Sequence, residues 1–337
     1  MRKFLLNLLS FLLVGLIPVV IVLSSYFYFD PFKVLYKYDN YSNSHVSLNR
    51  DYVSTEMFVK NNKLYHYNSF IFGSSRTMAY RPDSWIKKLD PNAHIFVFDA
   101  HSESIYGIYI KLKYLDETNC KIDNALIIIC RDQTFSQGGD GNSRGHMFMK
   151  DPVTSHESSF EFQIASFKSY INPFFLFDFL YYKLTHQYKN FMWGNIEENA
   201  ISYDKKTNAI QEVSNKETEI NKNPIAYYAN KKDEFYKRYG ERTDSVQRID
   251  AGGIYMFNEI ARILKEHNTN YKVVLSPLYE QIKYSKPDIN NLKSIFGSNL
   301  YDFSGKNSFT NSKYNYYESS HYRKTVGDSI LNIIYKK

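Results

Sequence analysis

A continuous apolar run near the N-terminus constrains this chain more than any other feature. Residues 4–23 read FLLNLLSFLLVGLIPVVIVL, with no charged side chain and only Asn7 and Ser10 strongly polar. At about 1.5 Å per residue, a helix of this length spans the roughly 30 Å hydrocarbon core of a bilayer. No later segment approaches this length without charges. We therefore expect residues 1–29 to form a single transmembrane signal anchor.

The flanks of the run predict its orientation. Arg2 and Lys3 precede it, which favours a cytoplasmic N-terminus, and the aromatic residues 26–29 follow it as an interfacial belt would. A cleaved signal peptide is the alternative, although the apolar core of such peptides is usually about 7–15 residues long. With an uncleaved anchor, everything after Asp30 lies on the extracytoplasmic side, periplasmic or extracellular.

The charge distribution and the cysteines indicate which partners and motifs to expect. The net charge is +7, from 42 basic and 35 acidic residues that are scattered along the chain. Nucleic-acid binders usually concentrate their basic residues on one stripe or arm, so we expect no nucleic-acid partner. Cys120 and Cys130 fit neither a zinc pattern nor a CxxC redox motif, and a disulfide between them and a buried Cys130 thiol both remain open.

The chain after the apolar run alternates apolar strands with helices. Residues 30–65 are polar and rich in Tyr and Asn, which predicts a stem that links the anchor to a domain over residues 66–337. Within that domain, short apolar runs predict strands at 68–73, 94–98, 125–130, 271–275 and 299–303. Helical spacing predicts helices at 104–115, 255–267 and 325–335. Continuous apolar strands separated by helices predict an α/β fold with a parallel sheet covered on both faces.

Residues from about 135 to 250 do not follow this alternation. They include a glycine-rich loop at 137–145, an aromatic helix at 174–184 and a polar stretch at 197–223. We interpret them as a helical insertion within one domain. The insertion is large enough to cover an acceptor site, and the alternatives are an ordinary helical subdomain or contact with the bilayer surface.

Two short motifs carry the candidate chemistry. Gly73-Ser74-Ser75-Arg76 follows the first predicted strand, where a serine on a tight turn is exposed at the sheet edge and its amide can face an oxyanion. The helix expected after this turn would add partial positive charge. Near the other end of the chain, Glu318 precedes His321 by three residues. A carboxylate at this spacing can bond the imidazole, fix its tautomer and leave the other nitrogen to deprotonate a serine.

With these motifs the sequence resembles the SGNH (GDSL-like) hydrolase and acyltransferase superfamily, in particular its membrane-anchored O-acyltransferase branch of DltD-like and alginate O-acetylation proteins. The resemblance rests on residues 72–76 and 318–322, with 301–305 also similar, and covers about 66–134 and 253–335. It implies a three-layer α/β/α, flavodoxin-like fold. It also implies Ser75 as nucleophile, His321 as base and Glu318 as the orienting acid, with no metal or organic cofactor.

The sequence departs from the superfamily pattern in ways that affect the oxyanion hole. Ser74 and Glu318 each stand where the superfamily usually has Asp, and neither the second-block glycine nor the third-block Gly-x-Asn is present. The Ser75 amide is therefore the first oxyanion candidate. Further candidates for oxyanion or substrate binding are the Ser102 and Ser104 amides and the Gln133 and Arg76 side chains.

Two functional hypotheses remain open. In the first, the protein is an extracytoplasmic serine O-acyltransferase or esterase that acts on a cell-envelope polysaccharide. An anchor suits transfer better than hydrolysis, and the resemblance implies O-acetylation with a polytopic membrane acyltransferase as partner. In the second, it is a non-catalytic relative that binds glycan or acts as a scaffold in an envelope assembly complex.

Overall fold

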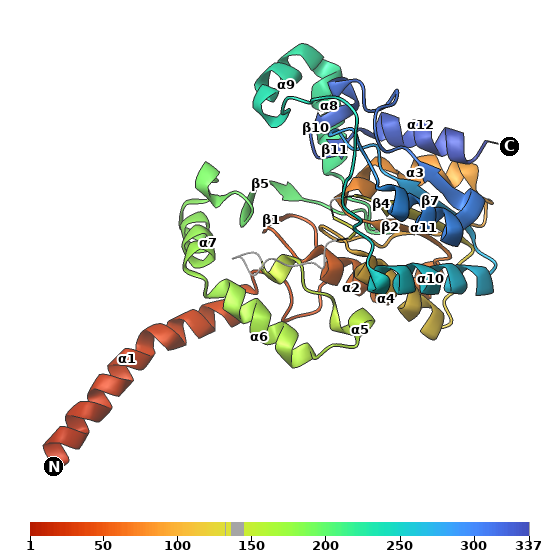
Figure 1. The fold of residues 1–337 in the computed structure, drawn as a ribbon. Coiled ribbons are helices and arrows are strands. Elements are labelled where there is room, and N and C mark those ends of the chain that lie inside the picture. Colours follow the sequence, from red (N-terminus) through yellow and green to blue (C-terminus); the bar gives the residue numbers. More distant parts are fainter. Residues whose placement is uncertain (132, 136–144, 337) are drawn as a thin grey trace.

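A computed structural model describes residues 1–131, 133–135 and 145–336, apart from the side chains of 212–214. Its centre is a five-stranded parallel sheet (Figure 1). The strands are β2 (Ser69–Gly73), β3 (Ile95–Val97), β4 (Asn124–Ile129), β7 (Asn270–Leu275) and β9 (Leu300–Asp302). They correspond to the predicted strands, and their spatial order is β3-β2-β4-β7-β9. Of the five strands of this sheet, the first in chain order, β2, therefore lies between the second, β3, and the third, β4.

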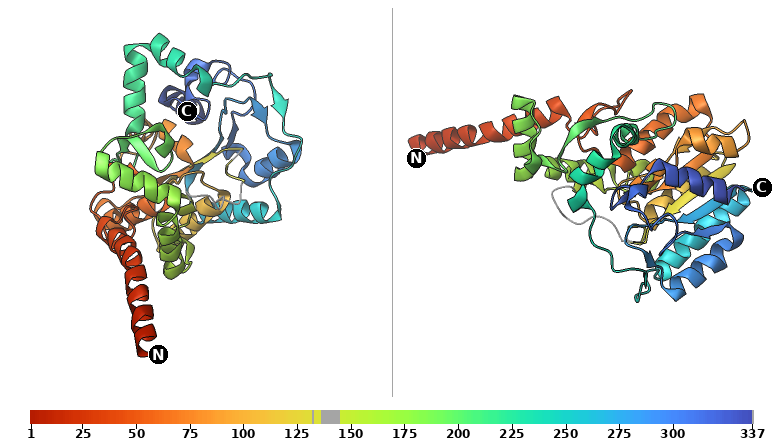
Figure 2. Two further views of the ribbon diagram at one scale, coloured as in Figure 1. Left: turned by 90° about the vertical axis from the view of Figure 1, so that its left-hand side faces the viewer. Right: turned by 90° about the horizontal axis from the view of Figure 1, so that it is seen from above.

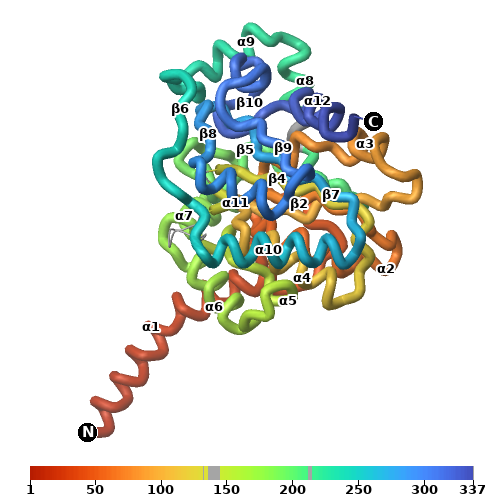
Figure 3. The backbone as a smooth tube through the Cα atoms, turned by 45° about the vertical axis from the view of Figure 1, so that its right-hand side comes forward, coloured from red at the N-terminus to blue at the C-terminus, as the bar shows by residue number. Residues whose placement is uncertain are grey.

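Helices cover both faces of this sheet, because successive side chains of its apolar strands point to opposite sides. Phe70 and Phe72 of β2 pack with α2 (Arg50–Tyr65), α4 (Ile105–Glu117), α10 (Ala251–Glu266) and α11 (Lys286–Phe296). Ile71 between them packs with α3 (Pro82–Trp85) and α12 (Lys324–Ile334) on the other face. Figure 3 shows the two helical layers on either side of the sheet. The expectation of a mixed α/β chain with a parallel sheet is confirmed.

The segment expected to be a stem is part of the folded domain. Residues 30–65 contain β1 (Ser44–Val46) and α2, and the first half of α2 is buried. Its Arg50 is 1% exposed and its Nε lies 2.8 Å from Asp99 Oδ1 at the end of β3. The stem expectation was wrong because charged residues of this segment are buried against partners elsewhere in the chain, Arg50 against Asp99 and Asp51 against Lys111.

The insertion is mainly helical, as expected, but it also contains strands. Its elements are α5 (Pro152–Ser155), α6 (Ser159–Tyr170), α7 (Pro173–Thr185), β5 (Ile196–Ile201), α8 (Glu212–Lys222), α9 (Pro224–Asn230) and β6 (Arg242–Thr243). β5 pairs with β1, and β6 pairs with β8 (Ile282–Lys283). The predicted aromatic helix is α7. Of the predicted glycine-rich loop, residues 137–144 lie outside the described residues.

The N-terminal apolar run forms one long helix, α1 (Arg2–Phe29), which extends away from the domain (Figures 1 and 2). Its most apolar stretch of 18 residues has a mean hydropathy of 2.7, and none of this stretch is buried. By length and composition, α1 could cross a bilayer. It ends at Phe29 and is capped by Asp30, whose backbone is left-handed and whose carboxylate accepts hydrogen bonds from the amides of Val34 and Leu35.

Candidate active site

The turn that carries the serines is shaped by Gly73 at the end of β2. Its φ is +146°, and a Cβ at this position would lie 2.7 Å from the carbonyl oxygen of Ile128. Only glycine allows the strand to end so close to β4. Ser74 and Ser75 follow, and Ser75 begins a five-residue 3₁₀ helix, η1 (Ser75–Ala79). The helix expected here is thus only a short turn, so it adds less dipole than a full α-helix would.

The two serines have different surroundings. Ser74 is fully buried, and its Oγ lies 3.4 Å from the Cys130 sulfur. Ser75 is half-buried, and its Oγ lies 2.7 Å from His321 Nε2. Among the described residues, Ser75 is thus the one of the two serines whose hydroxyl is hydrogen-bonded to a histidine.

His321 and Glu318 face each other across a small hairpin formed by β10 (Tyr316–Glu318) and β11 (His321–Tyr322). Glu318 Oε1 accepts a hydrogen bond from His321 Nδ1. The other nitrogen, Nε2, is then left to accept the proton of Ser75. The three residues therefore form a continuous Ser–His–Glu relay, although Ser75 and His321 are 246 positions apart in the chain.

The electrostatics of the hairpin keep Glu318 ionised. Burial by itself raises the pKa of this carboxyl, but its hydrogen bond with His321 and the charges of His321 and Lys216 outweigh burial, so the pKa is lowered overall. The Lys216 Nζ lies 3.9 Å from Glu318 Oε2. An ionised Glu318 is what the stabilisation of an imidazolium at His321 requires.

A buried polar chain lies beneath the serine turn and connects it to the hairpin. Cys130, at the end of β4, lies between Ser74 and Ser276, with its sulfur 3.5 Å from Ser276 Oγ. Ser276 Oγ is 3.3 Å from the hydroxyl of Tyr322, which in turn donates to the hydroxyl of Tyr80. Cys120 and Cys130 are both free and buried, so no disulfide joins them.

The insertion supports the hairpin from outside. Glu217 of α8 forms a two-pronged ion pair with Arg323, at 2.9 and 2.6 Å, and accepts a hydrogen bond from Tyr317. The hydroxyls of Tyr227 and Tyr228 on α9 donate to carbonyl groups of β10. None of these supporting residues was predicted from the sequence, since they are brought to the hairpin only by the fold.

Arg76 and Gln133 lie together beside the relay. Arg76 is 5% exposed, and its Nε donates to the carbonyl of Ser320 at 2.9 Å. Its NH1 donates to Gln133 Oε1 at 3.2 Å. Arg76 therefore joins the serine turn, the loop before His321 and the segment after β4.

Ser104 has a different role from the one expected. Its amide donates to Glu103 Oε1 at 3.2 Å, and its hydroxyl caps α4 by accepting from the Gly107 amide. The amide is therefore already engaged, which removes it from the oxyanion candidates. Ser102 has a left-handed backbone, with φ +47°, and is half-buried. Among the described residues, no hydrogen bond links Ser102 to the relay.

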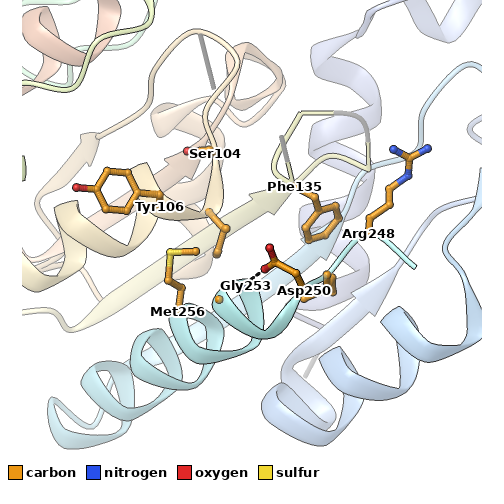
Figure 4. A pocket seen from close by; sticks show the side chains of 10 residues that line it. Ser104, Tyr106, Phe135, Arg248, Asp250, Gly253 and Met256 are labelled. Carbon is orange, nitrogen blue, oxygen red and sulfur yellow. Dashed lines mark hydrogen bonds between the residues drawn. The ribbon is translucent and has the colours of Figure 1, made fainter. Parts of the chain in front are cut away.

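A cavity of about 270 Å³ opens between the first turns of α4 and α10 (Figure 4). Its lining is mainly apolar, with Phe135 and Met256 on opposite sides, while Asp250 caps α10 through the Gly253 amide at 2.7 Å. No member of the Ser–His–Glu relay lines it. We therefore treat this cavity as separate from the candidate catalytic residues.

Within the described ranges, no group of three or more His, Cys, Asp and Glu side chains could hold a metal ion. No protein-family model and no curated protein matches this chain.

Proposed function

We propose that this protein is an extracytoplasmic serine enzyme that transfers an acyl group to, or removes one from, a cell-envelope polysaccharide. The observation that carries the proposal is the Ser75–His321–Glu318 relay, in which the serine hydroxyl lies 2.7 Å from the imidazole. Such a relay activates a hydroxyl that is otherwise a weak nucleophile at neutral pH.

Each residue has a defined task in this reaction. Ser75 Oγ attacks the carbonyl carbon of the donor ester while His321 Nε2 takes its proton. The tetrahedral intermediate collapses when His321 returns that proton to the leaving alcohol, which leaves an acyl ester on Ser75. A sugar hydroxyl or water, deprotonated by His321, then attacks the ester and regenerates the serine.

The oxyanion of each intermediate needs donors near Ser75. The Ser75 amide is the first candidate because it belongs to the turn that presents the nucleophile. The guanidinium of Arg76, held between Ser320 and Gln133, adds positive charge to the same edge. Glu318 stabilises the imidazolium that forms at His321 in both halves of the reaction.

The sheet topology supports the same site. In open α/β sheets, ligands bind beyond the carboxyl ends of the strands where the strand order reverses. Here that point lies between β2 and β4, and Ser75 follows β2 directly. When the five strands are numbered 1 to 5 in chain order, their spatial order β3-β2-β4-β7-β9 reads 2-1-3-4-5, which is the flavodoxin-like order. This order is compatible with the SGNH fold that the sequence resembles.

The anchor favours transfer over simple hydrolysis. With α1 spanning the membrane, the relay is held near membrane-bound acyl donors, and a polytopic membrane acyltransferase could hand over the acyl group.

A fusion tests the topology on which this argument depends. A reporter enzyme that is active only outside the cytoplasm, fused after Lys337, should be active. Mature protein that starts near Ser25 would instead indicate a cleaved signal peptide.

Transfer and hydrolysis can be separated directly. The protein is given p-nitrophenyl acetate with and without oligosaccharides from the native envelope, and free acetate and acetylated sugar are measured. We expect acetylated sugar that disappears in Ser75→Ala. Acetate release without acetylated sugar would identify an anchored esterase, and no turnover of any donor by folded protein would favour the glycan-binding or scaffold alternative.

A further inference from the structure

A group of large apolar side chains remains exposed where α1 enters the folded domain. They lie on α6, on α7 and on the short helix η4 (Asn190–Met192) with the residue after it. We call them the aromatic collar: Phe160, Phe174, Phe177, Leu184, Phe191 and Trp193, each between 57% and 83% exposed. Soluble surfaces rarely leave apolar groups of this size together without a partner.

The helices that bear the collar contact the last turn of α1. The ring of Tyr26 lies 5.2 Å from that of Phe167 and 5.0 Å from that of Tyr170. The ring of Phe29 lies 5.6 Å from that of Phe179, and the Lys183 ammonium lies over Phe29. The helices that carry the collar therefore pack against the end of α1 that meets the domain.

The direction of α7 agrees with a position in a membrane plane. Figures 1 and 2 show α6 and α7 grouped at the end of α1, with α7 running across the direction of α1. α7 buries Phe175 and Phe179 against the domain and exposes Phe174 and Phe177. A helix that runs across a transmembrane helix and exposes aromatic side chains can lie at the level of the bilayer interface, with its other apolar side packed on the domain.

We propose that the aromatic collar inserts into the interfacial layer of the same bilayer that α1 spans. Trp193 suits this layer because its ring meets apolar chains while its N–H reaches water. The Phe and Leu side chains of the collar add apolar area that the acyl boundary can bury. The domain is then fixed to the membrane along α6 and α7 as well as by α1. This second attachment holds the relay at a constant height and orientation above the bilayer.

The inference rests on the membrane anchor of the proposed function, but not on catalysis. A lipid occupant is favoured over a protein partner because α6 and α7, which carry most of the collar, pack against the end of α1, and the apolar stretch of α1 is entirely exposed. A surface that extends a lipid-facing helix is most simply covered by the same lipid.

The chain supplies its own probe for this contact. It contains two tryptophans, of which Trp85 is fully buried in the domain and Trp193 belongs to the collar. The full-length protein is reconstituted into phosphatidylcholine–phosphatidylglycerol liposomes that carry bromine at a shallow acyl position. We expect bromine to quench Trp193 fluorescence, and expect Trp193→Phe, which retains Trp85, to lose this quenching.

Paired variants separate the collar from the anchor. In Phe174→Ser/Phe177→Ser, the quenching of Trp193 should fall about twofold or more, because interfacial binding scales with apolar area. Tyr239→Ser is the matched control, since Tyr239 is 80% exposed and precedes β6 by three residues. Figure 3 shows β6 far from α1. The quenching of this variant should be unchanged. Thermal unfolding of each variant confirms that the domain is folded.

Flotation of the liposomes tests α1 independently. Protein that floats with the liposomes while Trp193 stays unquenched by bromolipid and accessible to aqueous acrylamide would overturn the collar and leave the anchor intact. The surface would then belong to a protein partner or to solvent. Protein that does not float would overturn the anchor and the collar together, whereas covalent capture of Ser75 would be unaffected.

Discussion

Gly327 of α12 lies directly against the carbonyl group of Ala79, the last residue of η1. A Cβ at position 327 would be 2.0 Å from the Ala79 carbonyl oxygen. Since η1 begins at Ser75 and α12 follows closely after His321, this contact sets how near the two ends of the relay can approach.

Gly327→Ala should therefore separate the histidine from the serine. Because the obstructing atom belongs to the backbone, the helix must shift, and we expect a loss of about 1–3 kcal/mol in stability. Reactivity at Ser75 should fall further than this stability loss explains. Gly252→Ala in the first turn of α10 is the control, since its nearest contact is at 3.4 Å and helix propensity should make it neutral or stabilising. Equal reactivity in both variants would contradict this account of the contact.

The buried Arg50–Asp99 pair should be essential to folding. Arg50→Ala leaves Asp99 buried without its counter-ion, which costs about 3–5 kcal/mol in comparable cases. Asp99 also accepts a hydrogen bond from Thr77 at 2.6 Å, so the serine turn should loosen as well. Denaturant unfolding measures the loss. Lys60→Ala, on the exposed side of the same helix, is the control and should cost no more than about 0.5 kcal/mol in stability. If Arg50→Ala had an equally small effect, residues 30–65 would not be an integral part of the folded domain.

The ion pair between Glu217 and Arg323 should stabilise the hairpin in a pH-dependent way. Burial raises the pKa of Glu217, but hydrogen bonds from Arg323 and Tyr317 outweigh it, so the pKa lies below its ordinary value of 4.5. A carboxyl with a lowered folded-state pKa stabilises the fold above its unfolded pKa and loses that effect as the pH falls through the folded value. The Tm advantage of the wild type over Glu217→Gln should be full at pH 7 and shrink below pH 4.5. A constant difference would disprove the pairing.

Asp151 should show the opposite dependence. Its side chain is fully buried, one oxygen accepts the Val153 amide at 2.7 Å, and burial followed by the charge of Asp51 raises its pKa to about 7. Folding then favours the protonated form, so this group costs stability as the pH rises from about 4 to about 7. Asp151→Asn should therefore gain in Tm relative to the wild type over that range and hold the gain above it. The exposed Asp83→Asn should show no such trend, and a pH-independent Asp151→Asn would contradict the raised pKa.

The sheet was predictable because its strands are continuous apolar runs. The runs ending at Gly73, Phe98 and Leu275 need no tertiary information to be identified, since a strand buried on both faces has no polar side. The Glu318–His321 contact was also predictable, because two side chains that are three residues apart on one turn can reach each other.

Other features could not be predicted because they depend on which side chains the fold brings into contact. Residues 30–65 were expected to be a stem because they are polar and rich in Tyr and Asn, and only the fold brings Asp99 and Lys111 to pair with Arg50 and Asp51 of α2. The Ser104 amide was expected to be open, but the side chain of Glu103 folds back onto it. Glu217 of the insertion supports the hairpin by binding Tyr317 and Arg323, which lie about a hundred positions away in the chain.

The base and the acid should differ in their effects on the rate. His321→Ala removes the group that transfers the proton, and we expect reactivity to fall about 1,000-fold or more. Glu318→Gln keeps a hydrogen-bonding side chain but loses the charge, so its cost should be smaller. The measured quantity is the second-order rate of reaction with a fluorophosphonate. A larger effect of Glu318→Gln would contradict the assigned roles.

Covalent capture of Ser75 tests the central claim most directly. The full-length protein is treated with a fluorophosphonate, its intact mass is measured, and the modified residue is located by peptide mapping. We predict a single adduct on Ser75, absent in Ser75→Ala and retained in Ser74→Ala, with every variant shown to be folded by thermal unfolding. Folded wild-type protein that stays unmodified, or an adduct that persists in Ser75→Ala and is lost in Ser74→Ala, would contradict the assignment of Ser75 as the nucleophile.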